Sequence, residues 1–240
     1  AAAPAGTRHK TGAAQQQFAR EAGLAVAGGI LFFVLVPLCI YWASYLPYWL
    51  KDSSFGLRSW WDCQTYMYWY HSTLSATHPF SSNWYSWLLD LRPVWYYMGS
   101  GLPEGQYASI AGFVSPVIAL AGLAAWLRLA QRQLVGEGSR AGAAVIILLL
   151  SSLLPWVMVA RCTFLYHYFP CVPFLITALA LCIGRWAERD EPTAGFAAVL
   201  LTAAAALLFV WFYPVLSGMP VGRVWAASMK WLASWGFYIL

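Results

Sequence analysis

Five apolar runs, separated by polar segments, dominate the pattern of this chain. A bilayer core about 30 Å thick needs about 20 apolar residues in each helix that crosses it, and each run is close to this length. The pattern therefore predicts an all-α polytopic membrane protein with about five transmembrane helices. The predicted helices cover approximately residues 22–43, 107–127, 141–159, 166–185 and 194–213.

The long segment between the first two runs, residues 44–106, is unusually rich in Trp and Tyr. Its stretch from Phe55 to Leu74 has no Pro and only one Gly, which favours a helix lying in the membrane interface. Residues 78–82, His-Pro-Phe-Ser-Ser, are typical of a turn because Pro fixes φ and Ser bonds the local backbone. Residues 91–97 are predicted to be extended, since the residue before a Pro avoids the helical region and the rest are largely β-branched or aromatic.

Basic residues in three regions predict the orientation of the helices. Alternation of five helices puts these three regions on one side, and the positive-inside rule assigns that side to the cytoplasm. Residues 1–21 are then a cytoplasmic linker, and residues 22–240 form one transmembrane region. The loop 44–106, the turn 160–166 and the tail 214–240 are external. The basic residues are Arg8, Lys10 and Arg20, then Arg128, Arg132 and Arg140, then Arg185 and Arg189.

Composition agrees with a membrane protein and excludes some functions. Hydrophobic residues make up 61% of the chain and charged residues 10%, against about 25% charged in a soluble domain. The net charge of +5 is concentrated in short loops, so it indicates topology and not nucleic-acid binding. The five cysteines show no zinc-type spacing.

One segment, Arg161 to Pro170 (RCTFLYHYFP), places a cation, an imidazole and several phenol rings where an apolar helix begins. Ionisable groups at such a depth are costly and often mark a site for a polar or charged ligand. An aromatic belt with one snorkelling arginine is the alternative.

Three blocks of sequence resemble the protein O-mannosyltransferase family. The first runs through YHSTL (70–74), THPFSSNWYSW (77–87) and LRPVWYY (91–97), and is similar to the family's conserved external loop. The second is the segment 161–170 followed by VPFL (172–175), and the third is FYPVLSGMP (212–220). The blocks occur in the family's order and cover most of the chain.

The resemblance implies the C-terminal part of a GT-C type glycosyltransferase, of bacterial type because the loop 44–106 is too short for a β-trefoil module. Such an enzyme transfers mannose from a polyprenyl-phosphate-mannose lipid to Ser or Thr hydroxyls of secreted or membrane proteins. It needs no metal or other cofactor and lies in the bacterial plasma membrane, or in the endoplasmic reticulum membrane of a eukaryote. Its catalytic acidic pair would lie in an N-terminal half outside this sequence, so no catalytic residue is assigned here and the segment alone is expected to be inactive.

Four residues are the candidates for binding the lipid phosphate. Arg92 and Arg161 stay charged near lipid and can bind phosphate with two parallel bonds, while His167 and Tyr168 could donate hydrogen bonds. Each has an alternative role. Arg92 could stack on an aromatic ring, Arg161 could snorkel, and His167 could bond between helices.

Four further residues are the candidates for sugar or acceptor contacts: His78, Trp84, Trp87 and Trp95. Alternatively, His78 organises a turn, and Trp84 and Trp87 pack against lipid headgroups. Asp62 and Asp90 are external aspartates, and either could pair with Arg92 or Arg58.

Two other classes of function remain open. A non-catalytic scaffold subunit would explain a chain that lacks a catalytic base. A small-molecule transporter fragment would need polar or broken positions within its helices, and no internal repeat is visible.

Overall fold

The computed structural model describes residues 5–238, and side chains from residue 15 onward. By their internal contacts these residues form two units, which divide after Thr73. Each unit is described by itself below.

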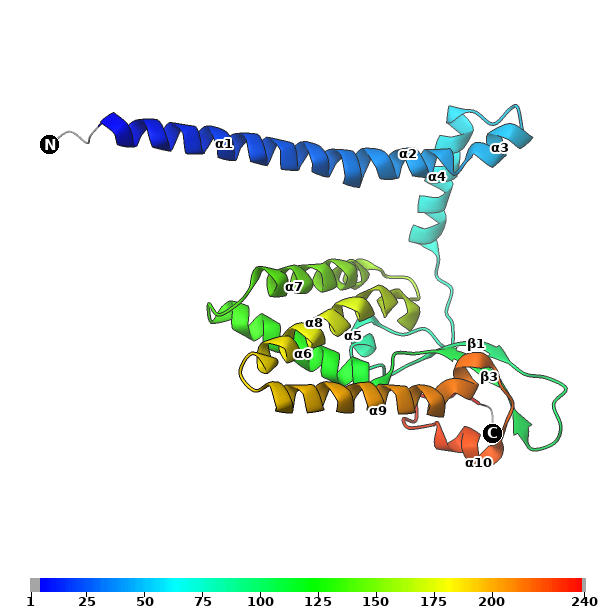
Figure 1. Ribbon diagram of the computed structural model, residues 1–240. Helices are drawn as coiled ribbons and strands as arrows, with labels where there is room; N and C mark the ends of the chain where they lie inside the picture. Colours follow the sequence, from blue (N-terminus) through cyan, green and yellow to red (C-terminus); the bar gives the residue numbers. More distant parts are fainter. Residues whose placement is uncertain (1–4, 239–240) are drawn as a thin grey trace. The chain divides into compact units, whose positions relative to one another are not determined.

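The first unit is a long helix followed by two shorter ones (Figure 1). The helix runs through α1 (Ala5–Ile30), a π-helical turn at Leu31–Leu35 and α2 (Val36–Ala43). The π turn ends two residues before Pro37, which lacks an N–H group, and a widened turn is a common way to accommodate such a break. The predicted helix 22–43 is therefore present, but helical structure begins much earlier, within the predicted linker.

Aromatic and amide side chains fold the end of this unit back on itself. α3 spans Leu46–Lys51 and α4 spans Leu57–Thr73, so the helix predicted near residues 55–74 is present. Gln64 of α4 donates a hydrogen bond to the Tyr45 hydroxyl at 3.0 Å, and the ring of Trp60 packs edge-on against Tyr45.

The second unit contains four long helices (Figure 1). They are α6 (Pro116–Leu134), α7 (Arg140–Leu153), α8 (Val172–Ala187) and α9 (Glu191–Ser217). Short connections join α6 to α7 and α8 to α9, and a longer one, residues 154–171, joins α7 to α8. α6 packs against α7, α8 and α9, and α8 also packs against α7 and α9. Short 3₁₀ helices follow α7 (Leu154–Met158) and precede α8 (Leu165–Cys171).

The helix ends follow local chemistry. Ser139 caps α7 by accepting a hydrogen bond from the Gly142 N–H, and Asp190 caps α9 through the Thr193 N–H. α9 ends at Ser217, where Gly218 takes φ 78°, a conformation that favours glycine.

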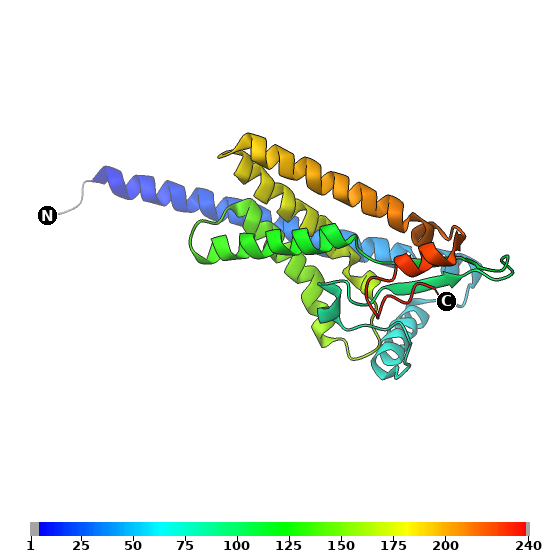
Figure 2. The ribbon, with the colours of Figure 1, turned by 90° about the horizontal axis from the view of Figure 1, so that it is seen from below.

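One end of this bundle carries the irregular elements (Figures 1 and 2). The short α5 (Trp84–Trp87) lies between the loop at 74–83 and β1 (Val94–Met98). β1 pairs with β3 (Ser109–Gly112), and β2 (Gln106–Tyr107) pairs with β4 (Val221–Gly222); both pairs are antiparallel. α10 (Arg223–Ser228) follows.

The fold is mostly helical, as predicted, but the predicted second span is misplaced. Residues 107–112 lie largely in strands, and the helix begins only at Pro116, because Ser109–Gly112 pairs with the extended segment after Pro93. Among the described residues, four helices are long and apolar enough to cross a membrane: Gln15–Lys51, Arg140–Met158, Leu165–Ala187 and Glu191–Ser217. α6 differs from them in carrying Arg128 and Arg132 in its last turns.

Small residues allow the central helices to approach closely. A Cβ atom built on Gly122 of α6 would lie 2.7 Å from the Cβ atom of Leu175 in α8. Leu175 is fully buried in the core that α6, α7 and α8 share with Trp87 and Tyr168. Because neither backbone can move without disturbing this core, Gly122 fixes the distance between α6 and α8.

We therefore expect Gly122→Ala to destabilise the protein by about 1–3 kcal/mol, the usual cost of overpacking a core. Gly184→Ala in α8 is the matched control, since nothing lies within 4 Å of its added Cβ. The measurement is the midpoint of thermal unfolding in detergent. Equal midpoints for the two variants would contradict the close contact between α6 and α8.

Candidate functional site

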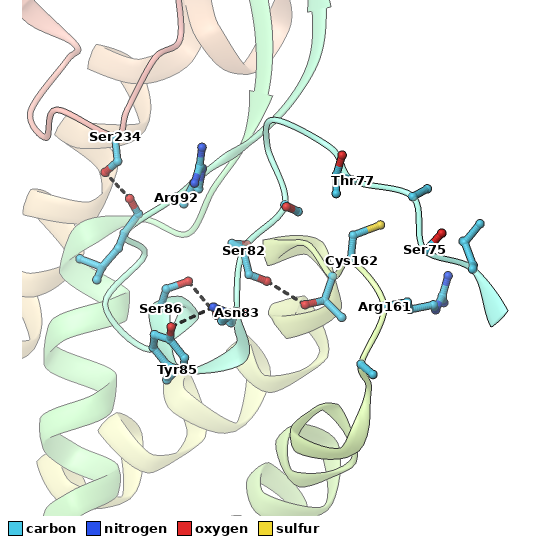
Figure 3. Close-up of a pocket in the computed structure, with 16 residues that line it drawn as sticks. Ser75, Thr77, Ser82, Asn83, Tyr85, Ser86, Arg92, Arg161, Cys162 and Ser234 are labelled. Carbon is cyan, nitrogen blue, oxygen red and sulfur yellow. Dashed lines mark hydrogen bonds between the residues drawn. The ribbon is translucent and has the colours of Figure 1, made fainter. Parts of the chain in front are cut away.

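A pocket of about 760 Å³ lies in the second unit and is lined by three segments far apart in the sequence. They are the loop and short helix at residues 74–92, the turn at residues 160–163, and Ser234 near the C-terminal end (Figure 3). Both arginines that the sequence analysis singled out, Arg92 and Arg161, line it.

Two reciprocal hydrogen bonds hold the first two segments together. The Ser82 N–H donates to the Thr163 carbonyl at 2.8 Å, and the Thr163 hydroxyl donates to the Ser82 carbonyl at 2.7 Å. The Ser82 hydroxyl accepts a bond from the indole N–H of Trp87 at 2.9 Å. Since Trp87 is fully buried in the helical core, this pairing anchors both walls of the pocket to the bundle.

The two arginines differ in how they are held. The Arg92 guanidinium donates to the Pro79 carbonyl at 2.6 Å and makes no cation–π contact among the described residues. The half-buried Arg161 side chain makes no hydrogen bond or ion pair to any residue that the structure describes. All guanidinium N–H groups of Arg161 are therefore available to a ligand, and so are those of Arg92 that do not bond to Pro79.

Both histidines of the predicted site adjoin this pocket without lining it. His78 organises a turn, because its Nδ1 accepts from the Phe80 N–H at 3.2 Å and its carbonyl from the Ser81 N–H at 2.9 Å. His167 places Nδ1 3.1 Å from the Phe164 nitrogen. The ring of Phe164 also contacts the His78 ring, with centroids 5.2 Å apart. Phe164 thus contacts both histidines, His167 through its backbone and His78 through its ring, close to the turn that carries Arg161.

Two of the predicted site residues lie in the core of the bundle, and their contact with a ligand stays a prediction. The side chains of Trp87 and Tyr168 are both 0% exposed and pack in the same cluster, so neither presents a surface to a sugar or a phosphate. The sequence shows that these aromatic residues lie near a helix start, but it does not show whether their side chains point into the core or toward the surface.

The two remaining tryptophans lie outside the pocket. Trp84 is half-buried against the helical core, and Trp95 donates its indole N–H to the Ser109 hydroxyl at 2.6 Å. Their contact with sugar or acceptor stays a prediction.

The sequence analysis missed the polar side chains that line most of the pocket. The lining offers hydroxyl, amide and guanidinium groups. Among the side chains described, residues 15–238, no group of three or more His, Cys, Asp or Glu residues could hold a metal ion. The Ser- and Thr-rich sequence of 72–86 was the available signal, but only residues 78–82 within it were interpreted, as a turn. The hydroxyl and amide residues are Ser75, Thr77, Ser81, Ser82, Asn83, Tyr85, Ser86, Thr163 and Ser234.

Asp90 does not line the pocket but is adjacent in sequence to Leu91, which does. It is 1% exposed, has φ 50°, and its Oδ2 accepts from the Val114 N–H at 2.9 Å. Its carbonyl accepts from the indole N–H of Trp235 at 2.9 Å, which positions the neighbouring Ser234. An ion pair of Asp90 with Arg92 is absent from the second unit as described, because the Asp90 carboxylate accepts from the Val114 N–H and its carbonyl accepts from the indole of Trp235.

Burial raises the pKa of Asp90 from its ordinary 3.8 to about 7, although the bond from the Val114 N–H opposes this shift. The folded protein therefore keeps this proton over a pH range in which the unfolded chain has lost it. Stability contributed by the proton is fully present below about pH 4 and is lost as the pH rises to about 7.

We expect Asp90→Asn to remove this pH dependence, because an amide cannot ionise, still accepts from Val114 and tolerates positive φ. The thermal midpoint of the variant should exceed that of the wild type by a margin that grows between pH 5 and pH 7.5. The scale is about 1.4 kcal/mol for each unit of pKa difference. Parallel midpoint curves for the two proteins would show that Asp90 does not titrate in this range.

The pairing of Ser82 with Thr163 yields a second prediction. Thr163→Val removes a buried hydroxyl and leaves the Ser82 carbonyl without its partner, which costs about 1–3 kcal/mol, whereas Thr163→Ser keeps the bond. Thr177→Val is the control, since the Thr177 hydroxyl bonds only within its own helix, to the Pro173 carbonyl. Thermal midpoints should fall for Thr163→Val alone; an unchanged midpoint would contradict the reciprocal pairing.

Comparison with known families matches residues 56–235 to the C-terminal four TMM region of protein-O-mannosyltransferase. The matched residues contain the four long helices α6 to α9.

Curated relatives agree with this match. The chain is 27% identical over 243 residues to a polyprenol-phosphate-mannose–protein mannosyltransferase of Mycolicibacterium smegmatis, covering 85% of this chain and 46% of that protein. It is 24% identical over 247 residues to a protein of the same name from Mycobacterium tuberculosis, covering 84% of this chain and 45% of that one. The chain thus spans about half the length of the curated relatives it matches.

A solved structure shares the fold. It is the S. cerevisiae protein O-mannosyltransferase Pmt1-Pmt2 complex bound to the sugar donor, with a TM-score of 0.62 and 19% sequence identity. The likeness covers 76% of this chain and 27% of that one. With residues 56–235 of its 240 matched by the family model, the chain belongs to the protein O-mannosyltransferase family.

Proposed function

We propose that this chain is part of a membrane glycosyltransferase that transfers mannose from a polyprenyl-phosphate-mannose lipid to Ser or Thr hydroxyls of proteins. In this proposal the pocket between residues 74–92 and 160–163 binds the phosphate of the lipid donor. The observation that carries it is that Arg92 and Arg161, from distant parts of the sequence, line one polar pocket.

The chemistry of the donor fits this lining. A polyprenyl-phosphate-mannose carries one phosphodiester anion, and its leaving group is a phosphate with more negative charge. Guanidinium groups bind phosphate oxygens with charge-assisted bonds that strengthen as this charge develops. Arg161 has no competing partner among the described residues, and the exposed hydroxyls of Ser75 and Thr77 could bond sugar or phosphate oxygens at the same rim.

The remaining parts of the proposal concern location and partners. The positive-inside rule supports placing the pocket on the external face of a bacterial plasma membrane, where secreted or membrane proteins would be the acceptors. A general base is needed to deprotonate the acceptor hydroxyl. In this proposal an acidic residue outside the present sequence supplies it, and His78 and His167 support the turns that carry the arginines.

The pocket also bears on the other two classes of function. A transporter site is expected midway along broken helices, but this pocket is lined by loop residues and the start of a short helix. In a scaffold subunit Arg161 would bind no substrate, so replacing it would not change mannosyl transfer. The Arg161→Ala variant described below therefore tests the scaffold hypothesis.

We expect Arg161→Ala in the full-length enzyme to lower kcat/KM for the lipid donor roughly ten- to a hundredfold. The reason is the loss of a charge-assisted bond, worth about 1.5–3 kcal/mol. Arg161→Lys should lose less, because it keeps the charge but not the bidentate geometry. The measurement is mannosyl transfer to a Ser/Thr peptide at varied donor concentration.

Arg223→Ala is the matched control, since Arg223 is an exposed arginine outside the pocket. It should leave kcat/KM within about twofold of the wild type, a change of about 0.4 kcal/mol. A stable Arg161→Ala enzyme with unchanged kcat/KM would exclude Arg161 from donor binding and favour an anchoring or scaffold role.

A further inference from the structure

The α6–α7 and α8–α9 connections lie at the end of the bundle opposite the strands (Figure 2). A second cationic pocket lies beside these two connections. It has a volume of about 180 Å³. Arg128 and Arg132 reach it from the last turns of α6, Arg185 from the last turn of α8, and Arg189 from the turn that follows. Leu129, Cys182 and Trp186 complete the lining.

The positive charge in this pocket is poorly balanced by the protein. Glu137 approaches Arg132 at 3.5 Å, the single salt bridge within the described residues, and its carbonyl accepts from Arg185 at 3.5 Å. Asp190 is occupied in capping α9. Four guanidinium groups thus line the pocket, and only the Glu137 carboxylate contacts one of them at salt-bridge distance within the described residues. Glu188 and Glu191 flank Arg189 in the sequence but form no such salt bridge.

One of these guanidinium groups is also incompletely bonded. The Nε atom of Arg132 is buried and has no hydrogen-bond partner within the described part of the chain. A buried charged donor without an acceptor is unfavourable, so an external anion with several oxygens would stabilise this arrangement.

Two general effects explain basic residues here but not their convergence. The positive-inside rule favours arginine in short cytoplasmic loops, and arginine in a last helical turn interacts well with the helix dipole. Exposed Arg140 fulfils the first without lining the pocket. Neither effect requires four arginines, three from two helices and one from the turn after α8, to line one cavity.

We propose that this pocket binds the phosphate of an anionic phospholipid headgroup, in the leaflet opposite the proposed donor site. Basic pockets between transmembrane helices on the cytoplasmic side are suited to such headgroups. The indole of Trp186, which is partly exposed at the pocket, suits the same interfacial depth. Arginine forks bind the phosphate oxygens, and the acyl chains remain in the bilayer.

Native mass spectrometry of the full-length protein tests this proposal, with phosphatidylglycerol, zwitterionic phosphatidylcholine and inorganic phosphate titrated separately. The wild type should bind phosphatidylglycerol at least about tenfold more tightly than phosphatidylcholine, a difference of about 1.4 kcal/mol. Arg128→Gln/Arg185→Gln should abolish this preference. Arg128→Lys/Arg185→Lys, which keeps the charge, should retain a preference and shows that substitution at these positions is tolerated.

Arg20→Gln/Arg140→Gln removes the same charge outside the pocket and is the matched control. It should change phosphatidylglycerol affinity by less than about twofold. An equal loss in this control would mean that diffuse charge alone attracts the lipid, and would overturn the proposal. Absence of a lipid preference in the wild type would also overturn it, as would binding of inorganic phosphate as tight as that of the lipid.

Discussion

The candidate site depends on the pairing of Ser82 with Thr163. Two hydrogen bonds, at 2.8 and 2.7 Å, join backbone segments that lie 81 residues apart. Arg161 is two residues from this pairing, and Arg92 follows the short helix that Ser82 precedes. Each bond contributes only about 1 kcal/mol net, so the pairing persists because Trp87, which bonds to Ser82, is buried in the helical core. The position of the charged Arg161 side chain thus depends on packing inside the bundle.

The bundle also separates two cationic sites with different surroundings. At one end, two arginines lie among hydroxyl and amide groups, which suits a ligand with a phosphate and a sugar. At the other end, four arginines lie against Leu129 and Trp186, which suits a headgroup at the edge of a bilayer. The tight contact at Gly122 keeps the helices between the two sites at a fixed distance.

The helices were largely predictable from the sequence, because apolar runs of membrane length have few alternative structures. α7, α8 and α9 lie close to their predicted positions. The start of α6 was not predictable in this way, since Ser109–Gly112 is extended through pairing with a distant strand. The helical structure of residues 5–21 was missed because this stretch has no apolar run.

The sequence indicated which types of residue form the site, but not how their side chains are arranged in space. Arg92 and Arg161 were identified because arginine near lipid requires a reason, and they share one pocket. The burial of Tyr168 and Trp87 was not predictable, because an aromatic residue at a helix start can face the core or the surface with the same sequence spacing. Asp90 gave no sequence signal, since its role depends on backbone groups of Val114 and on Trp235, far along the chain.

The central claim is that the lipid phosphate occupies the pocket beside Arg161. Cys162 lines this pocket and is a free, partly exposed thiol. The most direct measurement is its rate of maleimide labelling in the full-length protein, followed by peptide mass spectrometry, with exposed Cys39 as the internal reference. Saturating polyprenyl-phosphate-mannose should slow labelling of Cys162 but not of Cys39, and a polyprenol without phosphate should protect far less. An unchanged rate at Cys162 with the donor bound would contradict the account.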